Sequence, residues 1–334
     1  MTNFPLPLRF GLVGTGYAAK LRADALTADD RAHLVAVAGR DLCRTQVFSQ
    51  AYGTEAHHSW RSLVQDPRID AVVIATVNSE HGAIAHAALS AGKHVVVEYP
   101  LALDVAVATQ LVELARVNQQ LLHVEHIELL GGLHQTLKAN LEAIGQPFYA
   151  RYITANPQHP APQKWTYRSA TFGFPLIGAL SRLHRLIDLF GRVERVACEA
   201  RFWPQGDFTD TYAACVCTAH LRFSNGVIAD VTYAKGETIW QAKRLMEVQG
   251  SHGALVFQGD RGCLITAPGQ QELPVPTRQG LFAKDTALVL DHLTQGHPLY
   301  IKPAASLYTL QVAAAAQQAA ETGQVVAIPN SDIS

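Results

Sequence analysis

The stretch that decides the fold reads Gly11-Leu12-Val13-Gly14-Thr15-Gly16-Tyr17-Ala18-Ala19. It holds a GxGxxA pattern directly after the apolar run Leu8–Val13 and at the start of a segment with helical spacing. Gly14 permits a tight turn, Gly16 lets the backbone come close to a pyrophosphate, and Ala19 lets the helix pack closely on the strand. The helix N-terminus adds free N–H groups that attract phosphate. We therefore predict a dinucleotide-binding turn made by Gly14, Thr15, Gly16, Tyr17 and Ala18.

Strand and helix patterns alternate from this turn to about residue 125. The expected strands are 8–13, 33–38, 71–76, 94–98 and 121–125, and the expected helices are 17–28, 41–51, 78–91 and 104–118. The run Ala71–Thr76 is almost continuously apolar, which is typical of a strand buried on both faces of a sheet. Repeated units of this kind predict an α/β domain with a parallel, doubly wound sheet of the Rossmann type over residues 1–125.

The pattern changes after about residue 126. Helices are expected at 133–144 and 176–190, the second ending at Gly191, and a strand is expected at 148–155. Further strands are expected at 195–203, 211–223, 227–233, 244–248, 254–257 and 263–266. We predict an α+β domain with a large, mainly antiparallel sheet over residues 126–334. The final helix, about residues 304–322, is a candidate to pack back on the first domain.

The composition excludes several classes of protein. The chain has 334 residues, 48% of them apolar and 16% charged, with a net charge of −1. This balance indicates large buried cores and lacks the basic footprint of a nucleic-acid binder. No stretch is apolar enough to span a membrane, and the N-terminus does not read as a signal peptide. Five scattered cysteines without a CxxC pair favour reduced thiols and a cytoplasmic location.

The second expected strand ends without the carboxylate that usually holds the ribose of NAD. It reads Val37-Ala38-Gly39-Arg40, and Gly39 follows Gly16 by 23 residues. Arg40 is placed to pair with the 2′-phosphate of NADPH, with Arg44 in support. The alternative is that Arg40 stacks on adenine and the protein uses NADH. We favour NADPH as the cofactor, with NADH as a weaker substitute.

Longer segments resemble a known family. The segments Thr76–His81 (TVNSEH) and Gly92–Pro100 (GKHVVVEYP) resemble the glucose-fructose oxidoreductase/inositol dehydrogenase superfamily, as does the two-domain layout. Within it the chain is more similar to the cyanobacterial-type biliverdin reductases. The segments that carry this closer resemblance are Glu98–Leu103 (EYPLAL), His123–Gly132 (HVEHIELLGG), Phe172–Leu176 (FGFPL), Gly280–Phe282 (GLF) and the glycine turn itself. The resemblance covers nearly the whole chain.

The chain departs from the sugar dehydrogenases of that superfamily at the residues that handle a hydroxyl proton. Tyr99 stands where their EKP motif has its lysine. Ser181 and Arg185 stand where their active-site helix carries an Asp and, four residues later, a basic His. Oxidation of an alcohol needs a base of tunable pKa, and arginine stays protonated at any working pH. The chain therefore keeps the cofactor motif and lacks the alcohol-oxidising groups.

Reduction of a bilin makes other demands, which the same helix can meet. The substrate carries two propionates and a broad conjugated face, so its site needs cations and apolar walls. Arg182 and Arg185 lie three residues apart and are expected on one helix face, with Asp188 placed to orient Arg185. Arg244 is a weaker candidate for a propionate, and surface ion pairs are the alternative for the arginines. The candidate walls, which core packing explains equally well, are Trp165, Phe172, Phe174 and Trp203.

The resemblance implies further roles near the cofactor. The cofactor contacts that it adds are Thr76, Asn78, His81, Glu98 and Tyr99. The candidates for proton handling are Tyr99, His126 and Glu98, although His126 can equally be a hydrogen-bonded structural histidine. His123 and His126 end a strand, but no carboxylate or cysteine cluster completes a metal site, so no metal is expected.

These expectations combine into one hypothesis and two alternatives. The hypothesis is NADPH-dependent reduction of biliverdin to bilirubin, by hydride transfer to the central methine carbon and protonation of a pyrrole nitrogen. The first alternative is an NAD(P)-dependent oxidoreductase for a sugar, polyol or small carbonyl compound, and the second is a non-catalytic dinucleotide-binding sensor. The expected partner is a small molecule, with no nucleic acid and no membrane. The chain is expected as a monomer or as an oligomer paired through the second sheet.

Overall fold

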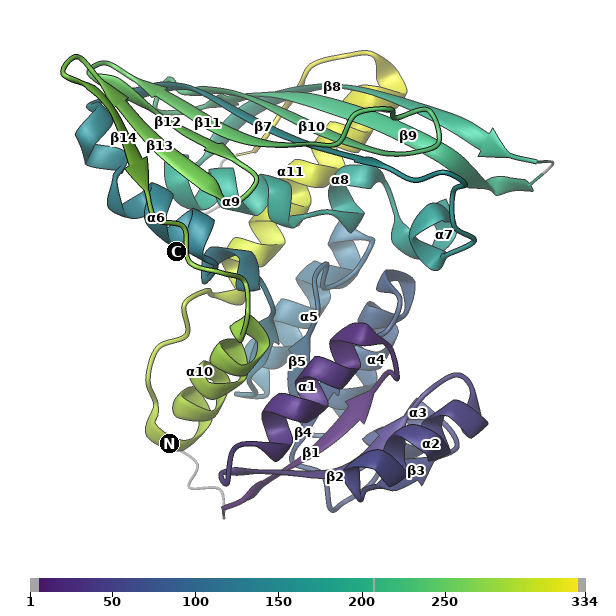
Figure 1. Ribbon diagram of the computed structural model, residues 1–334. Helices are drawn as coiled ribbons and strands as arrows, with labels where there is room; N and C mark the ends of the chain where they lie inside the picture. Colours follow the sequence, from purple (N-terminus) through teal and green to yellow (C-terminus); the bar gives the residue numbers. More distant parts are fainter. Residues whose placement is uncertain (1–5, 207, 330–334) are drawn as a thin grey trace. The chain divides into compact units, whose positions relative to one another are not determined.

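The computed structural model describes residues 6–206 and 208–329, which form two compact units (Figure 1). Among the described residues, unit 1 contains 6–127 together with 280–307. Unit 2 contains the described residues of 128–279 together with 308–329. The segment 280–307 thus groups with unit 1. The sequence analysis placed residues 126–334 in the second domain and named only the final helix, about 304–322, as a candidate to pack back on the first. The final helix begins in unit 1 and continues in unit 2.

Unit 1 is built on a six-stranded parallel sheet in the order β3-β2-β1-β4-β5-β6. Its strands are β1 (Leu8–Val13), β2 (Ala32–Ala38), β3 (Glu55–His57), β4 (Ala71–Ile74), β5 (His94–Val97) and β6 (Leu122–Val124). The strand order reverses at β1, which pairs with β2 on one side and β4 on the other. Ligands of doubly wound sheets bind at the carboxyl ends of the strands beside such a reversal. The glycine turn lies at this place because it directly follows β1.

Helices flank the strands of unit 1. They are α1 (Tyr17–Thr27), α2 (Leu42–Tyr52), α3 (Trp60–Val64), α4 (Asn78–Ser90), α5 (Val105–Val117) and α10 (Leu281–Gln295). Asp41 caps α2 and Asp104 caps α5 through side-chain acceptors at the first turn, which satisfies backbone N–H groups that a helix leaves open. Helix α10, which the sequence analysis left unassigned, packs against α1 and contributes Val289 and Leu290 to the buried core under β1.

Unit 2 contains a nine-stranded sheet in the order β14-β13-β12-β11-β7-β10-β9-β8-β15. Its strands are β7 (Pro147–Pro157), β8 (Val193–Gln205), β9 (Phe208–Phe223), β10 (Ile228–Gly236), β11 (Lys243–Gly250), β12 (Gly253–Gln258), β13 (Arg261–Thr266), β14 (Gly269–Leu273) and β15 (Val326–Ala327). All neighbours pair antiparallel except β7 and β10, which are parallel. The predicted fold class, a Rossmann domain followed by a mainly antiparallel sheet, is confirmed.

The helices of unit 2 are short, apart from the last. They are η1 (Ile127–Leu129, whose first residue lies in unit 1), α6 (Gly132–Ala139), η2 (Leu141–Ile144), η3 (Trp165–Tyr167), α7 (Ser169–Phe172), α8 (Pro175–Gly178), α9 (Ser181–Phe190) and α11 (Pro303–Thr322, which begins in unit 1). The single helix expected over 176–190 is wrong: α8 and α9 are separate, because Ala179 leaves the helical region at φ −112° and ψ 40°. Gly191 ends α9 at φ +80°, as predicted. In the part of the chain that the structure describes, none of the helices has both the length and the apolar character of a membrane crossing.

Candidate active site

The glycine turn of unit 1 has the geometry that a dinucleotide requires. Gly14 adopts φ +131°, and a Cβ atom there would lie 2.2 Å from the carbonyl oxygen of Ala75, so only glycine fits. At Gly16, by contrast, no described atom lies within 4 Å of the position of a Cβ, which leaves open space above the turn. Gly16 caps α1 without a side-chain hydrogen bond. The first turn of α1 can therefore offer its N–H groups to a pyrophosphate.

The end of β2 lies against the same turn, and two exposed arginines follow it, one in the loop and one in α2. A Cβ on Gly39 would lie 2.6 Å from Thr45 Oγ1 and 3.0 Å from Thr15 Cγ2, so this position also favours glycine. Arg40 and Arg44 are both exposed. The neighbouring carboxylate of Asp41 accepts a hydrogen bond from the Arg44 backbone N–H at 3.0 Å, which assigns it to the cap of α2. The local charge available to a bound phosphate is thus positive.

The loops after β4 and β5 are tied together by a buried histidine. Nδ1 of His81 lies 2.8 Å from the Pro100 carbonyl oxygen, and Nε2 lies 3.3 Å from that of Thr76. Burial lowers the pKa of His81, and the contacts with the two carbonyl oxygens oppose this shift. Asn78 is buried in the first turn of α4. His81, which was predicted as a cofactor contact, thus joins the two loops that carry Thr76 and Tyr99.

Tyr99 is supported by a layer of buried side chains. Its ring stacks on that of His126, with centroids 5.4 Å apart and planes 6° from parallel. His126 is fully buried: its Nε2 lies 2.9 Å from Ser306 Oγ, and its backbone N–H donates to the Tyr300 hydroxyl at 3.0 Å. His126 is thus buried and hydrogen-bonded, and its role in proton handling stays a prediction.

Beneath Glu98 lies a buried group of charges that the sequence analysis did not find. Arg22 is 1% exposed; its Nε donates to Glu98 Oε1 at 2.9 Å, and its Nη1 donates to Asp285. Asp285 also receives the Tyr300 hydroxyl at 2.7 Å and lies 2.8 Å from His123 Nε2. Burial raises the pKa of the nearby Glu125, and the carboxylate of Glu98 raises it further. A signal was present in the sequence, since Arg22 falls on the apolar face of α1 with Ala19 and Leu26.

In unit 2 the two predicted arginines of α9 have different environments. The Arg182 guanidinium is half-buried, lies 5.3 Å from the Tyr233 ring centroid and donates to Ser181 Oγ at 3.0 Å. Arg185 is 2% exposed, and its Nη2 donates to Glu128 Oε2 at 2.7 Å. The expected pairing of Arg185 with Asp188 is wrong. Asp188 is bound instead by His134 at 2.8 Å and Lys138 at 3.0 Å.

Arginine side chains from several elements surround the carboxylate of Glu128. Besides Arg185, it accepts a hydrogen bond from Arg278, a residue that the sequence analysis passed over. Burial opposes its ionisation, but the charges of the surrounding arginines hold its pKa below the usual value, with Arg182 and Arg244 acting at longer range. Arg244 itself pairs with Asp260 at 3.3 Å. Two carboxylates, Glu128 and Asp260, among four arginines leave an excess of positive charge, which suits an anionic ligand.

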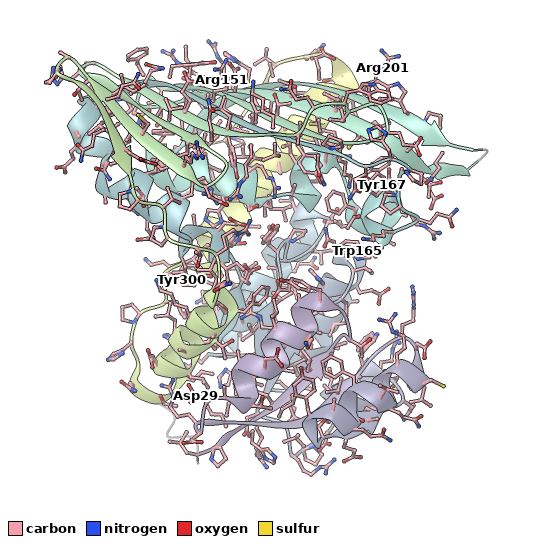
Figure 2. The ribbon with its side chains drawn as sticks, in the orientation of Figure 1. Asp29, Arg151, Trp165, Tyr167, Arg201 and Tyr300 are labelled. Atoms are coloured by element: carbon pink, nitrogen blue, oxygen red, sulfur yellow. The ribbon has the colours of Figure 1, made fainter. Side chains whose placement is uncertain are left out.

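The predicted aromatic walls are only partly brought together. Trp165 packs on Phe172 with centroids 5.9 Å apart, and Phe172 stacks on Tyr233 at 6.5 Å. Figure 2 shows Trp165 and Tyr167 on the helical side of the unit 2 sheet, opposite Arg151 and Arg201. Phe174 is half-buried at the start of α8. Trp203 is separate, since it lies under Arg201 on β8 at 4.8 Å.

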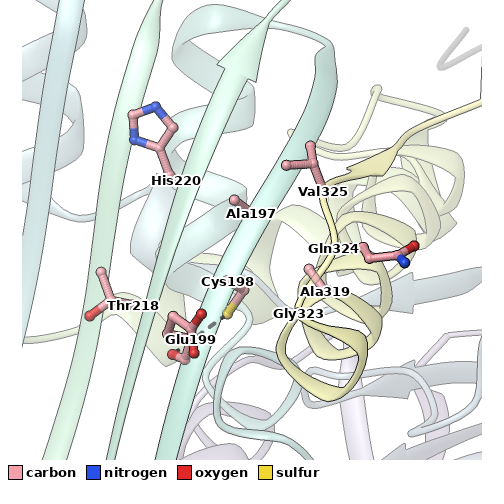
Figure 3. A pocket seen from close by; sticks show the side chains of 9 residues that line it. All are labelled: Ala197, Cys198, Glu199, Thr218, His220, Ala319, Gly323, Gln324 and Val325. Carbon is pink, nitrogen blue, oxygen red and sulfur yellow. Dashed lines mark hydrogen bonds between the residues drawn. The ribbon is translucent and has the colours of Figure 1, made fainter.

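A surface hollow of about 250 Å³ lies elsewhere on unit 2 (Figure 3). It is lined by Ala197, Cys198, Glu199, Thr218, His220, Ala319, Gly323, Gln324 and Val325. This described lining contains none of the predicted site residues. Among residues 6–206 and 208–329, moreover, no three His, Cys, Asp or Glu side chains form a group able to hold a metal ion.

Comparison with known families agrees with both units. The oxidoreductase family with an NAD-binding Rossmann fold matches residues 8–126, and the C-terminal alpha/beta domain of that family matches residues 138–328. The chain therefore belongs to the Gfo/Idh/MocA oxidoreductase family, which confirms the resemblance seen in its motifs. It is an NAD(P)H-dependent oxidoreductase.

The chain is also similar to individual proteins of this family. The chain is 50% identical to the biliverdin reductase of Synechocystis sp. PCC 6803, solved in complex with biliverdin and NADP+, with a TM-score of 0.92 over 94% of this chain and 99% of that one. It is 34% identical to mouse (Mus musculus) biliverdin reductase A, over 42% of this chain and less than half, 44%, of that protein. It is 27% identical to inositol 2-dehydrogenase of Acidothermus cellulolyticus, over 80% and 78% of the two chains.

Proposed function

We propose that this chain is an NADPH-dependent biliverdin reductase. The observation that carries the proposal is the group of four arginines around Glu128, two of them on α9, where a sugar dehydrogenase of the family would carry its general base. The identity of 50% with a reductase solved with biliverdin and NADP+ supports the same conclusion. The reaction consumes biliverdin, NADPH and one proton and yields bilirubin and NADP+.

The residues of unit 2 suit an anionic, planar substrate. Biliverdin has two propionate carboxylates, and forked guanidinium groups bind carboxylates with two parallel hydrogen bonds. We propose that three arginines bind the substrate: Arg182, Arg185 and the more exposed Arg244. The apolar walls of the substrate site are Trp165, Phe172 and Phe174 in this proposal. Because a guanidinium stays protonated, the arginines stabilise negative charge and do not exchange protons with the bilin.

The residues of unit 1 suit NADPH. The turn Gly14–Ala18 would hold the pyrophosphate, and Arg40 with Arg44 would hold the 2′-phosphate. Thr76, Asn78 and His81 would shape the loops beside the nicotinamide. When bound, this cofactor supplies the hydride for the central methine carbon. We propose that a proton reaches the pyrrole nitrogen through Tyr99 or Glu98, while His126 holds the Tyr99 ring.

The proposal has a direct optical test. Protein, NADPH and biliverdin are mixed, and the visible spectrum is followed together with NADPH absorbance. We expect the bilin band to move to that of yellow bilirubin as NADPH is consumed in equal amount. Oxidation of a polyol with NAD, without any change to biliverdin, would instead favour the sugar dehydrogenase alternative. Cofactor binding without turnover of either substrate would favour a sensor.

The choice between NADPH and NADH depends on Arg40. Replacing Arg40 by alanine should raise the Michaelis constant for NADPH by about 10- to 150-fold, because one charge-assisted contact to the 2′-phosphate contributes roughly 1.5–3 kcal/mol. The Michaelis constant for NADH should change little. Steady-state kinetics with both cofactors measures the difference, with Arg116→Ala on α5 as an exposed control. Equal changes for both cofactors would show that Arg40 does not contact the phosphate.

A further inference from the structure

Lys235 of unit 2 has surroundings that the proposed chemistry does not use. It is the second-to-last residue of β10 and is 5% exposed. Its Nζ lies 4.2 Å from the ring centroid of Phe172 and 4.5 Å from that of Tyr167. The rings of Tyr212 and Tyr233 follow at 5.2 and 5.7 Å. A single ammonium group is thus enclosed by four aromatic rings from η3, α7, β9 and β10.

The charge of Lys235 is balanced in an unusual way. Among the described residues no carboxylate pairs with it, and its hydrogen bond goes to the carbonyl oxygen of Thr166, which also accepts the Tyr212 hydroxyl at 3.0 Å. Burying an ammonium group costs free energy, which desolvated cation–π contacts offset in part. An uncharged side chain of the same length would fill this space without that cost. A charge kept here therefore calls for a role beyond filling the core.

Lys235 and the four rings around it connect Trp165 with Arg182, two residues that we assign to substrate binding. Thr166 belongs to η3, and the preceding carbonyl of Trp165 accepts the Thr171 hydroxyl at 2.7 Å. Phe172, which contacts both Trp165 and Lys235, stacks on Tyr233. Tyr233 also contacts the Arg182 guanidinium, which lies 5.3 Å from its ring centroid. The wall residue Trp165 and the cation Arg182 are thereby joined through Lys235 and its rings.

We propose that Lys235 is a positioning residue, whose ammonium group holds the segment 165–172 and the Tyr233 ring in one arrangement and so places Trp165 and Arg182 for a planar, anionic substrate. This inference rests on the proposed function, because it takes biliverdin as that substrate. It assigns no contact between Lys235 and the bilin, since the lysine is enclosed. Loss of the charge should weaken substrate binding and leave the cofactor turn of unit 1 unaffected.

The proposal makes substrate binding sensitive to pH. Burial lowers the pKa of Lys235 to about 8, and the charge of Arg182 on α9 acts in the same direction. The other titratable groups around it are Tyr167 on η3, Tyr212 and Cys215 on β9, and Tyr233 on β10. Burial raises the pKa of Tyr167 to about 12 and that of Cys215 to about 11, and it raises that of Tyr212 too. Lys235 is therefore protonated below pH 8 and loses its charge as the pH rises from 7 to 9.

The test compares the wild-type protein with Lys235→Met, which has a neutral side chain of similar length, and with Lys243→Met as an exposed control on β11. Michaelis constants for biliverdin and NADPH are measured between pH 6.5 and 9.5. We expect Lys235→Met to raise the constant for biliverdin about 10-fold at pH 7 and to leave that for NADPH within twofold. The constant for biliverdin should rise above pH 8 in the wild type and in Lys243→Met, and should not depend on pH in this way in Lys235→Met.

A second measurement does not depend on activity. Lys164 and Arg168 flank η3, are exposed, and are cleavage sites for trypsin. Faster cleavage at these two sites in Lys235→Met than in Lys243→Met supports the positioning role, and equal rates overturn it, whether or not biliverdin is reduced. If the wild type fails to reduce biliverdin, the proposed function is wrong and proteolysis alone decides about Lys235. If Lys235→Met does not fold, a wild-type constant for biliverdin that stays level from pH 7 to 9.5 overturns the proposal.

Discussion

Replacing Arg182 by alanine should lower the turnover of biliverdin by about 100- to 1000-fold, because removing one preorganised donor from a developing negative charge costs about 2.7–4 kcal/mol of transition-state stabilisation. Arg182 is suited to this role since it is only half-buried on α9, whereas Arg185 is almost fully buried. Its cation–π contact with Tyr233 holds the planar group in place without neutralising it. The Michaelis constant for NADPH should stay near that of the wild type.

The neighbouring arginine provides the contrast. Arg185 is held by Glu128 and is nearly inaccessible, so Arg185→Ala should first show itself as a loss of stability, with a lower melting temperature. Its effect on biliverdin should fall mainly on the Michaelis constant. Arg195→Ala, an exposed change on β8, is the matched control for the loss of a positive charge. If Arg182→Ala turns over biliverdin at the wild-type rate while NADPH binding confirms its fold, the charge must be supplied by another residue.

The elements that the sequence predicted are those with strong local signals. The turn Gly11–Ala19, the apolar run Ala71–Thr76 and the strands between residues 195 and 266 each carry a period or a glycine that fixes them locally. The three-residue strand β3 has too few residues to show a period. Ala179 itself is compatible with a helix, and Gly178 beside it is only a weak signal that a helix interior tolerates, so the break between α8 and α9 was not predicted.

The sequence was enough to predict candidate residues for the site, but not which side chains they pair with. The α9 arginines stand out in the sequence, yet Glu128, which binds Arg185, lies 57 residues before it. Asp188 was the partner expected from helical spacing, but His134 and Lys138 bind it from α6. Lys235 gives no local signal at all, because the rings around it come from elements between residues 165 and 233. Such pairings are set by the topology of the sheet, which a single sequence read locally does not contain.

The largest expected effect on stability belongs to the buried charges of unit 1. Replacing Arg22 by methionine should lower the free energy of unfolding by about 3–5 kcal/mol, since it leaves buried carboxylates without their cation. Asp285, which is 0% exposed, would keep only its hydrogen bonds from Tyr300 and His123. Chemical denaturation followed by circular dichroism, with NADPH binding as the reporter of unit 1, measures the loss. Arg31→Met is the matched control, because Arg31 also pairs with a carboxylate of α10, Asp291, but in a partly exposed position that should contribute less than about 1 kcal/mol.

The dependence of this loss on pH identifies its cause. Burial alone would raise the pKa of Asp285, but the charge of Arg22 and the contacts with His123 and Tyr300 hold this pKa well below the usual value in the wild type. The contribution of Asp285 to wild-type stability is therefore present above its unfolded pKa of about 3.9 and is lost as the pH falls. In Arg22→Met the sign reverses: the folded pKa rises above the unfolded value, so the variant is penalised at pH 7 and recovers as its carboxylates take up protons. The difference from the wild type should accordingly shrink between pH 7 and pH 4, and adding Asp285→Asn to Arg22→Met should restore part of the stability at pH 7. A loss that is the same at both pH values, and that the second change makes larger, would mean that packing of the arginine stem and not its charge stabilises α1 against α10.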